Sequence, residues 1–82
     1  MDEIEWDPTL YKYEHIARVL GERIRAGALP AGTLLSEVAY ESVFGVARHT
    51  VRQAFAILRD EGLIVTRRGK GSVVVARGDV LD

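Results

Sequence analysis

The chain of 82 residues contains no cysteine, which excludes disulfide bridges and thiolate metal sites. It contains no apolar run approaching the ~20 residues of a membrane-spanning helix. Its N-terminus lacks the basic-then-apolar pattern of an export signal, and it holds no internal repeat or low-complexity segment. These absences predict one small domain in the cytoplasm, with no membrane contact.

The sequence also has few residues that could assemble a catalytic or metal site. Its two histidines, His15 and His49, fall on different predicted helices, and Ser36 and Ser72 have no base near them in sequence. The glycine-lysine-glycine segment at residues 69–71 is not a nucleotide-binding loop, because the earlier glycine and the hydroxyl residue after the lysine are missing. We therefore expect no enzyme activity, no catalytic residue, no metal ligand and no cofactor.

The net charge of −1 conceals a separation of charge along the chain. Residues 1–41 carry eight acidic and four basic side chains, whereas residues 42–82 carry four acidic and seven basic ones. A charged partner responds to the local potential within a Debye length of roughly 10 Å. The C-terminal half can therefore present a basic surface, although charge alone leaves an ordinary mixed surface equally open.

Hydrophobic periodicity predicts three helices. Apolar residues recur at helical spacing over about residues 8–26, which predicts a helix that Asp7 caps, Pro8 opens and Gly27 ends. Ser36 caps a second predicted helix over about residues 37–44, which ends at Gly45.

A third helix is predicted over about residues 48–61, and Gly62 ends it. β-branched runs at residues 63–66 and 72–75 surround a glycine-containing tip and predict a hairpin. A short extended segment at residues 33–35 could pair with this hairpin. The predicted fold class is α+β, mainly α: a winged helix-turn-helix of three helices plus a small antiparallel β-hairpin wing.

This fold defines three regions of the chain. The DNA-binding domain is predicted to span residues 8–76, after an acidic N-terminal arm at residues 1–7 and before a C-terminal tail at residues 77–82. Trp6 is the one candidate for an anchor of the arm. A further hypothesis is that the acidic side chains of the arm fold back over the basic face and weaken DNA binding.

In a helix-turn-helix, the second helix of the pair lies in the major groove and its N-terminal residues reach base edges. Arginine can bond guanine with two parallel donors, and glutamine can do the same with adenine. The candidate residues here are Arg48, His49, Thr50, Arg52 and Gln53. An ordinary solvated helix face is the alternative interpretation of the same charged stripe.

The predicted hairpin tip gathers basic side chains beside glycine. Arg67, Arg68 and Lys70 suit phosphate contact or insertion into a minor groove, and Gly69 lets the backbone come close. Basic residues can also serve only to blunt an exposed sheet edge. The preceding helix favours the binding interpretation.

The chain resembles the GntR family of regulators over about residues 10–76. The positions that carry the resemblance are Tyr13-Glu14-His15-Ile16-Ala17, Leu20, Ile24, Gly27, Leu29-Pro30, Gly32, Ser36-Glu37, Gly45-Val46, Arg48, Thr50-Val51-Arg52, Ala54, Leu58, Glu61-Gly62-Leu63, Gly69 and Gly71. The resemblance implies a bacterial winged-helix transcription regulator that binds palindromic operators as a dimer. The family positions that contact DNA correspond to Ser36, Arg48, His49, Thr50, Arg52, Arg68 and Gly69.

Four positions depart from the family pattern. Leu35 stands where the family usually has proline, Val38 where it often has arginine, Glu41 where it has a small residue, and Ala47 where it has serine or threonine. Alanine cannot cap the third helix, a loss of ~1 kcal/mol. Family members normally also carry a C-terminal domain that senses a metabolite and makes the dimer.

The sequence thus predicts a transcription regulator whose partner is double-stranded DNA. A homodimer on a palindromic site, or a separate protein partner, is expected, and no effector pocket is expected within this chain. The alternative is a winged-helix adaptor that binds protein and not DNA. Its support is the near-neutral total charge and the acidic arm with Trp6.

Overall fold

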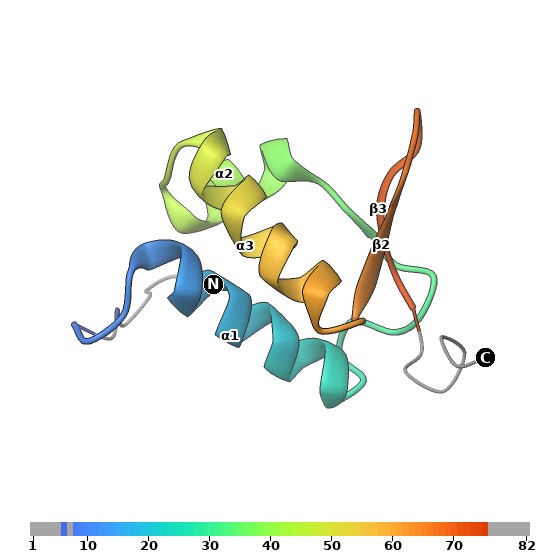
Figure 1. Ribbon diagram of the computed structural model, residues 1–82, viewed down its shortest axis with the longest axis horizontal. Helices are drawn as coiled ribbons and strands as arrows, with labels where there is room; N and C mark the ends of the chain where they lie inside the picture. Colours follow the sequence, from blue (N-terminus) through green and yellow to red (C-terminus); the bar gives the residue numbers. More distant parts are fainter. Residues whose placement is uncertain (1–5, 7, 76–82) are drawn as a thin grey trace.

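Three helices and a small three-stranded sheet make up the computed structural model, which describes Trp6 and residues 8–75 (Figure 1). The elements are, in order, α1 (Lys12–Arg25), β1 (Leu34–Leu35), α2 (Glu37–Phe44), α3 (Arg48–Asp60), β2 (Ile64–Arg67) and β3 (Gly71–Val74). This is the predicted winged helix-turn-helix, and that prediction is confirmed. Within the described residues, no helix is long and apolar enough to cross a membrane.

The start of α1 was predicted wrongly. Pro8 lies in a turn and not at the first helical position, and Asp7, the predicted cap, lies outside the described residues. The helix begins at Lys12, because the carboxylate of Glu14 accepts the backbone N–H of Tyr11 at 2.9 Å. A glutamate at the third helical position often reaches back in this way and fixes the first turn.

The α2–turn–α3 unit forms as its local signals predict. The hydroxyl of Ser36 accepts the backbone N–H of Ala39 at 3.1 Å and caps α2. Gly45 ends this helix in the left-handed region, with φ 66° and ψ 38°, where a side chain would be strained. Ala47 is the N-cap of α3 and supplies no side-chain bond to it, as expected.

The sheet has the strand order β1-β3-β2, and both pairings are antiparallel. The predicted pairing of the short extended segment with the hairpin is therefore confirmed, with Leu35 opposite Ser72. Both hairpin strands lie one residue nearer the tip than predicted. The tip closes with the N–H of Lys70 donating to the carbonyl of Arg67 at 2.9 Å.

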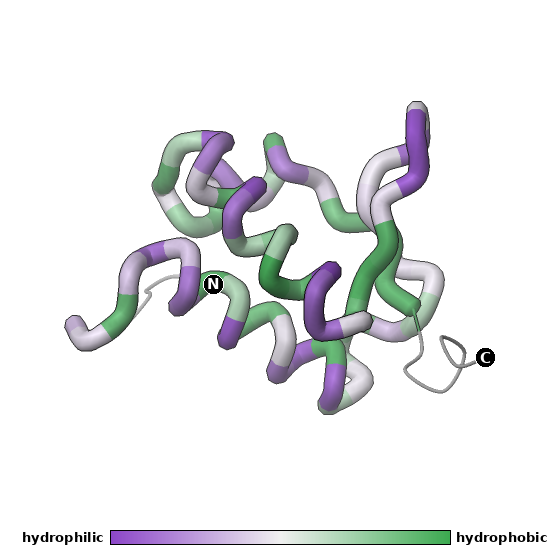
Figure 2. The backbone as a smooth tube through the Cα atoms, in the orientation of Figure 1, coloured by the Kyte–Doolittle hydropathy of each residue, from purple (hydrophilic) through white to green (hydrophobic). Residues whose placement is uncertain are grey.

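The core lies where α3 meets α1 and the sheet. Figure 2 shows hydrophobic stretches along α1, α3 and the strands, and hydrophilic residues at the wing tip. The buried apolar residues are Ile16, Ala17, Leu20, Leu35, Phe44, Val51, Ala54, Phe55, Leu58, Leu63, Ile64 and Val74. One continuous core therefore fixes all three helices and the base of the wing.

Substitution of Leu58 tests this core, since its side chain has no exposed surface. We expect Leu58→Ala to lower the free energy of unfolding by about 2–5 kcal/mol through lost burial and a residual cavity. Leu34→Ala is the matched control, because Leu34 is 62 % exposed and should change stability by only ~0.5 kcal/mol. Denaturant unfolding measures both; equal losses would contradict the assignment of the core.

Candidate nucleic-acid interface

Packing of one side of α3 decides which way its polar side chains point. Val51, Ala54, Phe55 and Leu58 are buried, so the remaining side of the helix faces outward. Of the five side chains that the sequence assigned to DNA on this helix, four are exposed, and Thr50 is half-buried. The exposed ones are Arg48, His49, Arg52 and Gln53.

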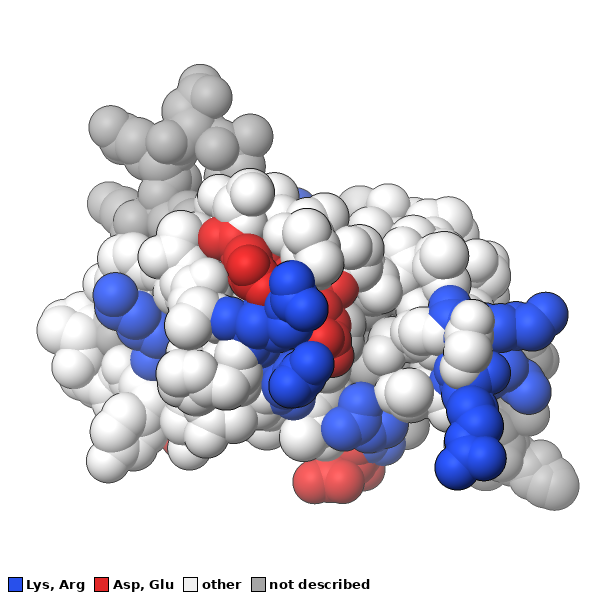
Figure 3. Space-filling view, turned by 90° about the horizontal axis from the view of Figure 1, so that it is seen from above, with Lys and Arg blue, Asp and Glu red and all other residues white. Residues whose placement is uncertain are grey.

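The exposed end of α3 and the wing tip project from the same side of the molecule. In Figure 1 the N-terminal end of α3 and the tip of the β2–β3 hairpin both lie at the top, whereas α1 lies below. Figure 3 looks down on this side and shows basic side chains over the helices and a second basic group over the wing. The structure thus brings the two predicted basic groups to one surface.

A chain of hydrogen bonds ties α3 to the base of the wing. Arg59 Nη1 donates to Thr66 Oγ1 at 2.8 Å, and Thr66 Oγ1 lies 3.0 Å from Ser72 Oγ. Thr66 and Ser72 are directly opposite each other on β2 and β3. The link was not predicted, because the partner of Arg59 depends on the register of the hairpin. It helps to fix the position of the wing relative to the helix.

Two glutamates of α2 pair with the arginines predicted to read bases. Arg48 Nε donates to Glu41 Oε2, and Arg52 Nε donates to Glu37 Oε1 at 3.0 Å. Sequence reasoning missed both pairs. The spacing places the two glutamates on one face of α2 and the two arginines on one face of α3, but it does not indicate whether these faces meet.

The acidic partners change the electrostatics of the helix face. The hydrogen bond that Arg48 donates to Glu41, and then the charge of Glu41, raise the pKa of Arg48 above its ordinary value, with a smaller contribution from the charge of Glu37. In Figure 3 acidic side chains lie directly beside the basic ones over the helices. The face is therefore less positive than its arginines alone would make it.

The wing tip differs in this respect. Within the part of the chain that the structure describes, Arg67, Arg68 and Lys70 form no ion pair, and all three are exposed. Gly69 adopts φ 77° at the tip, which keeps the turn tight and its backbone accessible. The wing thus offers unpaired cations at an exposed point.

A groove lies between the wing and the start of α2, with a volume of about 430 Å³. It is lined by Leu34, Leu35, Ser36, Glu37, Val38, Thr66, Lys70, Gly71 and Ser72. Ser36 is exposed here, and its hydroxyl keeps a hydrogen to donate after accepting the N–H of Ala39. Val38 brings an exposed apolar side chain where a family arginine was the expectation. The second helix therefore brings no cation from this position to the surface.

Trp6 packs against the start of the domain. Its ring centroid lies 5.0 Å from that of the buried His15 and 6.4 Å from that of Phe44, and Lys12 Nζ lies 5.4 Å from the Trp6 ring. These contacts hold Trp6 on the domain, and its role as the anchor of the arm stays a prediction. The other arm residues, 1–5 and 7, and the predicted tail at residues 77–82 lie outside the described residues. The hypothesis that the acidic arm folds back over the basic face concerns these residues and stays a hypothesis.

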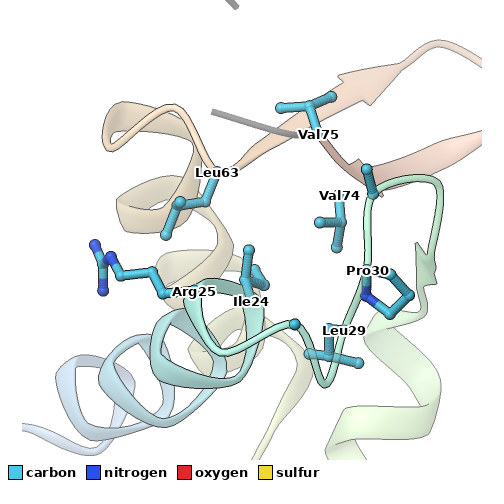
Figure 4. Close-up of a pocket in the computed structure, with 9 residues that line it drawn as sticks. Ile24, Arg25, Leu29, Pro30, Leu63, Val74 and Val75 are labelled. Atoms are coloured by element: carbon cyan, nitrogen blue, oxygen red, sulfur yellow. The ribbon is translucent and has the colours of Figure 1, made fainter. Parts of the chain in front are cut away.

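An apolar hollow of about 490 Å³ lies at the end of the molecule away from the wing tip (Figure 4). Its lining consists of Ile24, Arg25, Gly27, Leu29, Pro30, Ala31, Leu63, Val74 and Val75. The charged lining residue, Arg25, bonds Glu61 at 2.9 Å. A small-molecule site usually has several convergent polar groups, and this lining does not supply them. Among the described residues, no three acidic or histidine side chains gather as a metal site would require.

Comparison with known proteins assigns the chain to a family. The sequence profile described as bacterial regulatory proteins, gntR family, matches residues 12–74. The chain belongs to the gntR family. The predictions of a winged-helix fold and of membership in this family of regulatory proteins are confirmed.

Individual gntR relatives agree with this assignment. The transcriptional repressor NagR of Bacillus subtilis is 41 % identical over 63 residues, which cover 76 % of this chain and 26 % of NagR. A gntR-family regulator structure from Pseudomonas syringae matches with 33 % identity and a TM-score of 0.77, over 88 % of this chain and 30 % of that one. The DNA-binding domain of AraR, solved with operator ORR3, matches with 26 % identity and a TM-score of 0.77, over 92 % of each chain. The chain thus spans about a quarter of the length of NagR.

The uncapped start of α3 gives a prediction for this gntR domain. Ala47 has extended backbone, with φ −72° and ψ 158°, which suits a capping hydroxyl. Ala47→Ser should raise the free energy of unfolding by about 0.5–2 kcal/mol, because the new hydroxyl can accept a free N–H of the first turn. Ala26→Ser, at the C-cap of α1, is the control and should change stability by less than ~0.5 kcal/mol. Thermal or denaturant unfolding decides; no gain for Ala47→Ser would contradict the expected cap.

Proposed function

We propose that this chain binds a duplex operator as the DNA-binding part of a bacterial transcription regulator, acting as a repressor. The proposal depends on one observation: the exposed N-terminal end of α3 and the wing tip project from the same side (Figures 1 and 3). A B-DNA major groove is wide enough to admit an α-helix. A wing held beside that helix would then reach the neighbouring backbone or minor groove. The similar DNA-binding domain of AraR, solved with operator ORR3, supports operator binding by this fold.

In the proposed complex, α3 provides base recognition. Arg48 and Arg52 bond base edges, and their free terminal nitrogens suit the O6 and N7 atoms of guanine. Gln53 can bond adenine in the same manner. His49 and Thr50 contact phosphates or nearby bases, because they lie at the start of the helix, the end that comes closest to the DNA.

The wing and the cap of α2 provide backbone contacts. Arg67, Arg68 and Lys70 bind phosphates or enter the adjacent minor groove, and Gly69 lets the tip approach closely. Ser36 donates its free hydroxyl hydrogen to a phosphate. Such contacts fix the register of the protein on DNA and carry no sequence information directly.

Two copies are expected on one operator. A single module of this size buries roughly 600–1,000 Å² on DNA, against the 1,000–2,500 Å² of most specific interfaces. A homodimer on a palindromic site would double the contact, and a separate protein partner is the alternative source of the missing affinity. The proposed location is the cytoplasm, in association with the nucleoid.

Selection of bound duplexes from a random pool, with the mass of the complex measured, tests this function. The expected result is a palindromic sequence bound by two copies. A titration with random duplex at low salt should also show binding that weakens as salt rises. A protein that binds no duplex under either condition would be an adaptor module, and the proposal would be wrong.

Substitution of Arg52 and substitution of Lys70 should change DNA binding in different ways. Arg52→Ala should cost ~1–3 kcal/mol on the selected operator and relax the preference at one base pair, because a base contact is lost. Lys70→Ala should weaken all duplexes about equally and reduce the slope of log K against log salt by about one. Fluorescence titrations over a range of salt measure both. Arg25→Ala, which removes a cation at the end away from the wing tip, is the control and should leave binding unchanged.

A further inference from the structure

The arginine of α3 that is nearest its N-terminus is held by a carboxylate from another helix. Arg48 Nε donates to Glu41 Oε2, so the guanidinium of α3 is oriented by α2. Glu41 occupies a position at which the family resemblance leads one to expect a small residue. The contact is therefore a feature of this chain and does not follow from the family pattern.

This contact leaves the two terminal nitrogens of the Arg48 guanidinium available to bond a base. A guanidinium has five N–H donors arranged as a fork. The bond to Glu41 uses the Nε side, and the two terminal nitrogens can still form the parallel pair of bonds that guanine accepts. A side chain fixed at Nε also loses less rotational freedom when it reaches a base, so it is preorganised for that one contact.

The same carboxylate discourages contacts with phosphate. An unpaired surface arginine can swing toward any nearby phosphate, which gives affinity without sequence preference. A glutamate next to it adds a negative charge that phosphate must approach, and it reduces the net charge that the arginine contributes. Arg52, held by Glu37 at 3.0 Å, lies in the same environment one helical turn away.

Folding stability does not account for the pair. The Arg48 side chain is 49 % exposed and that of Glu41 28 %. Ion pairs at such exposed sites contribute little to the stability of a fold. A carboxylate placed against a base-reading arginine has a larger consequence for binding than for folding.

We propose that Glu41 is a specificity-determining residue that acts through Arg48, holding its guanidinium for one base pair and keeping it from non-specific phosphate contact. This inference rests on the proposed operator binding. Glu41 is a positioning residue in this scheme, because Arg48 and not Glu41 touches the base.

The test compares the base preferences of the wild type, Glu41→Gln and Arg48→Ala by selection from a random duplex pool. The base pair read by Arg48 is the one whose preference disappears in Arg48→Ala. Glu41→Gln should reduce the preference at that same pair by about five-fold or more, the lower bound of what one bidentate contact supplies. It should also bind random duplex more tightly, with a salt slope steeper by about one.

Glu61→Gln is the matched control. Glu61 forms an exposed pair with Arg25 at 2.9 Å, so its replacement removes the same charge and the same kind of pair. That pair lies near the last turns of α1 and α3, away from the Arg48 end of α3. Glu61→Gln should leave the base preferences unchanged. Equal thermal unfolding of the wild type, Glu41→Gln and Glu61→Gln shows that neither glutamate substitution acts through the fold.

A double variant separates positioning from bulk charge. If Glu41 acts through Arg48, adding Glu41→Gln to Arg48→Ala leaves the selected sequence and the salt slope as they are in Arg48→Ala alone. A further change in the double variant would overturn the inference, because Glu41 would then act on DNA by itself. A Glu41→Gln protein with wild-type preferences would overturn it as well, while operator binding stands. A wild type that binds no duplex would remove both proposals.

Discussion

Burial of one side of α3 is the constraint on which the rest of the structure depends. Val51, Phe55 and Leu58 have almost no exposed surface, and each such side chain contributes roughly 1.5–3 kcal/mol when fully buried. An exposed ion pair contributes only about 0–1 kcal/mol. Packing, and not the arginine–glutamate pairs, therefore sets the rotation of the helix. Once that rotation is set, Arg48 and Arg52 can only face outward.

Much of this fold could be predicted because its signals are local. Ser36 caps the helix that follows it, Gly45 ends that helix, and β-branched runs on both sides of a glycine tip give the wing. The start of α1 was the exception, since two local signals competed. Pro8 resembles a helix opening, but Glu14 reaches back to Tyr11 and the helix begins there. The candidate residues of α3 and the wing followed from the same patterns, and DNA contact by them remains a proposal.

The contacts between elements could not be predicted in the same way. Glu41 and Arg48 are separated by seven residues, as are Arg59 and Thr66, yet each contact depends on how two elements cross. A turn of three residues lets α2 and α3 meet at many angles, and one-residue slips of the hairpin would move Thr66 to the other face of the sheet. The sequence therefore indicated which side chains are exposed but not which of them are already paired.

The two basic groups on this surface differ in their environment, and the difference suggests a division of roles in the proposed complex. Arg67, Arg68 and Lys70 form no ion pair within the described residues, so the wing carries most of the uncompensated positive charge. Attraction to phosphate and its salt dependence would then come chiefly from the wing. Arg48 and Arg52 of α3 are partly neutralised by Glu41 and Glu37. Their binding energy would come mainly from a base that offers acceptors in the matching geometry. A total charge of −1 is compatible with DNA binding on these terms, because affinity and discrimination are assigned to different elements.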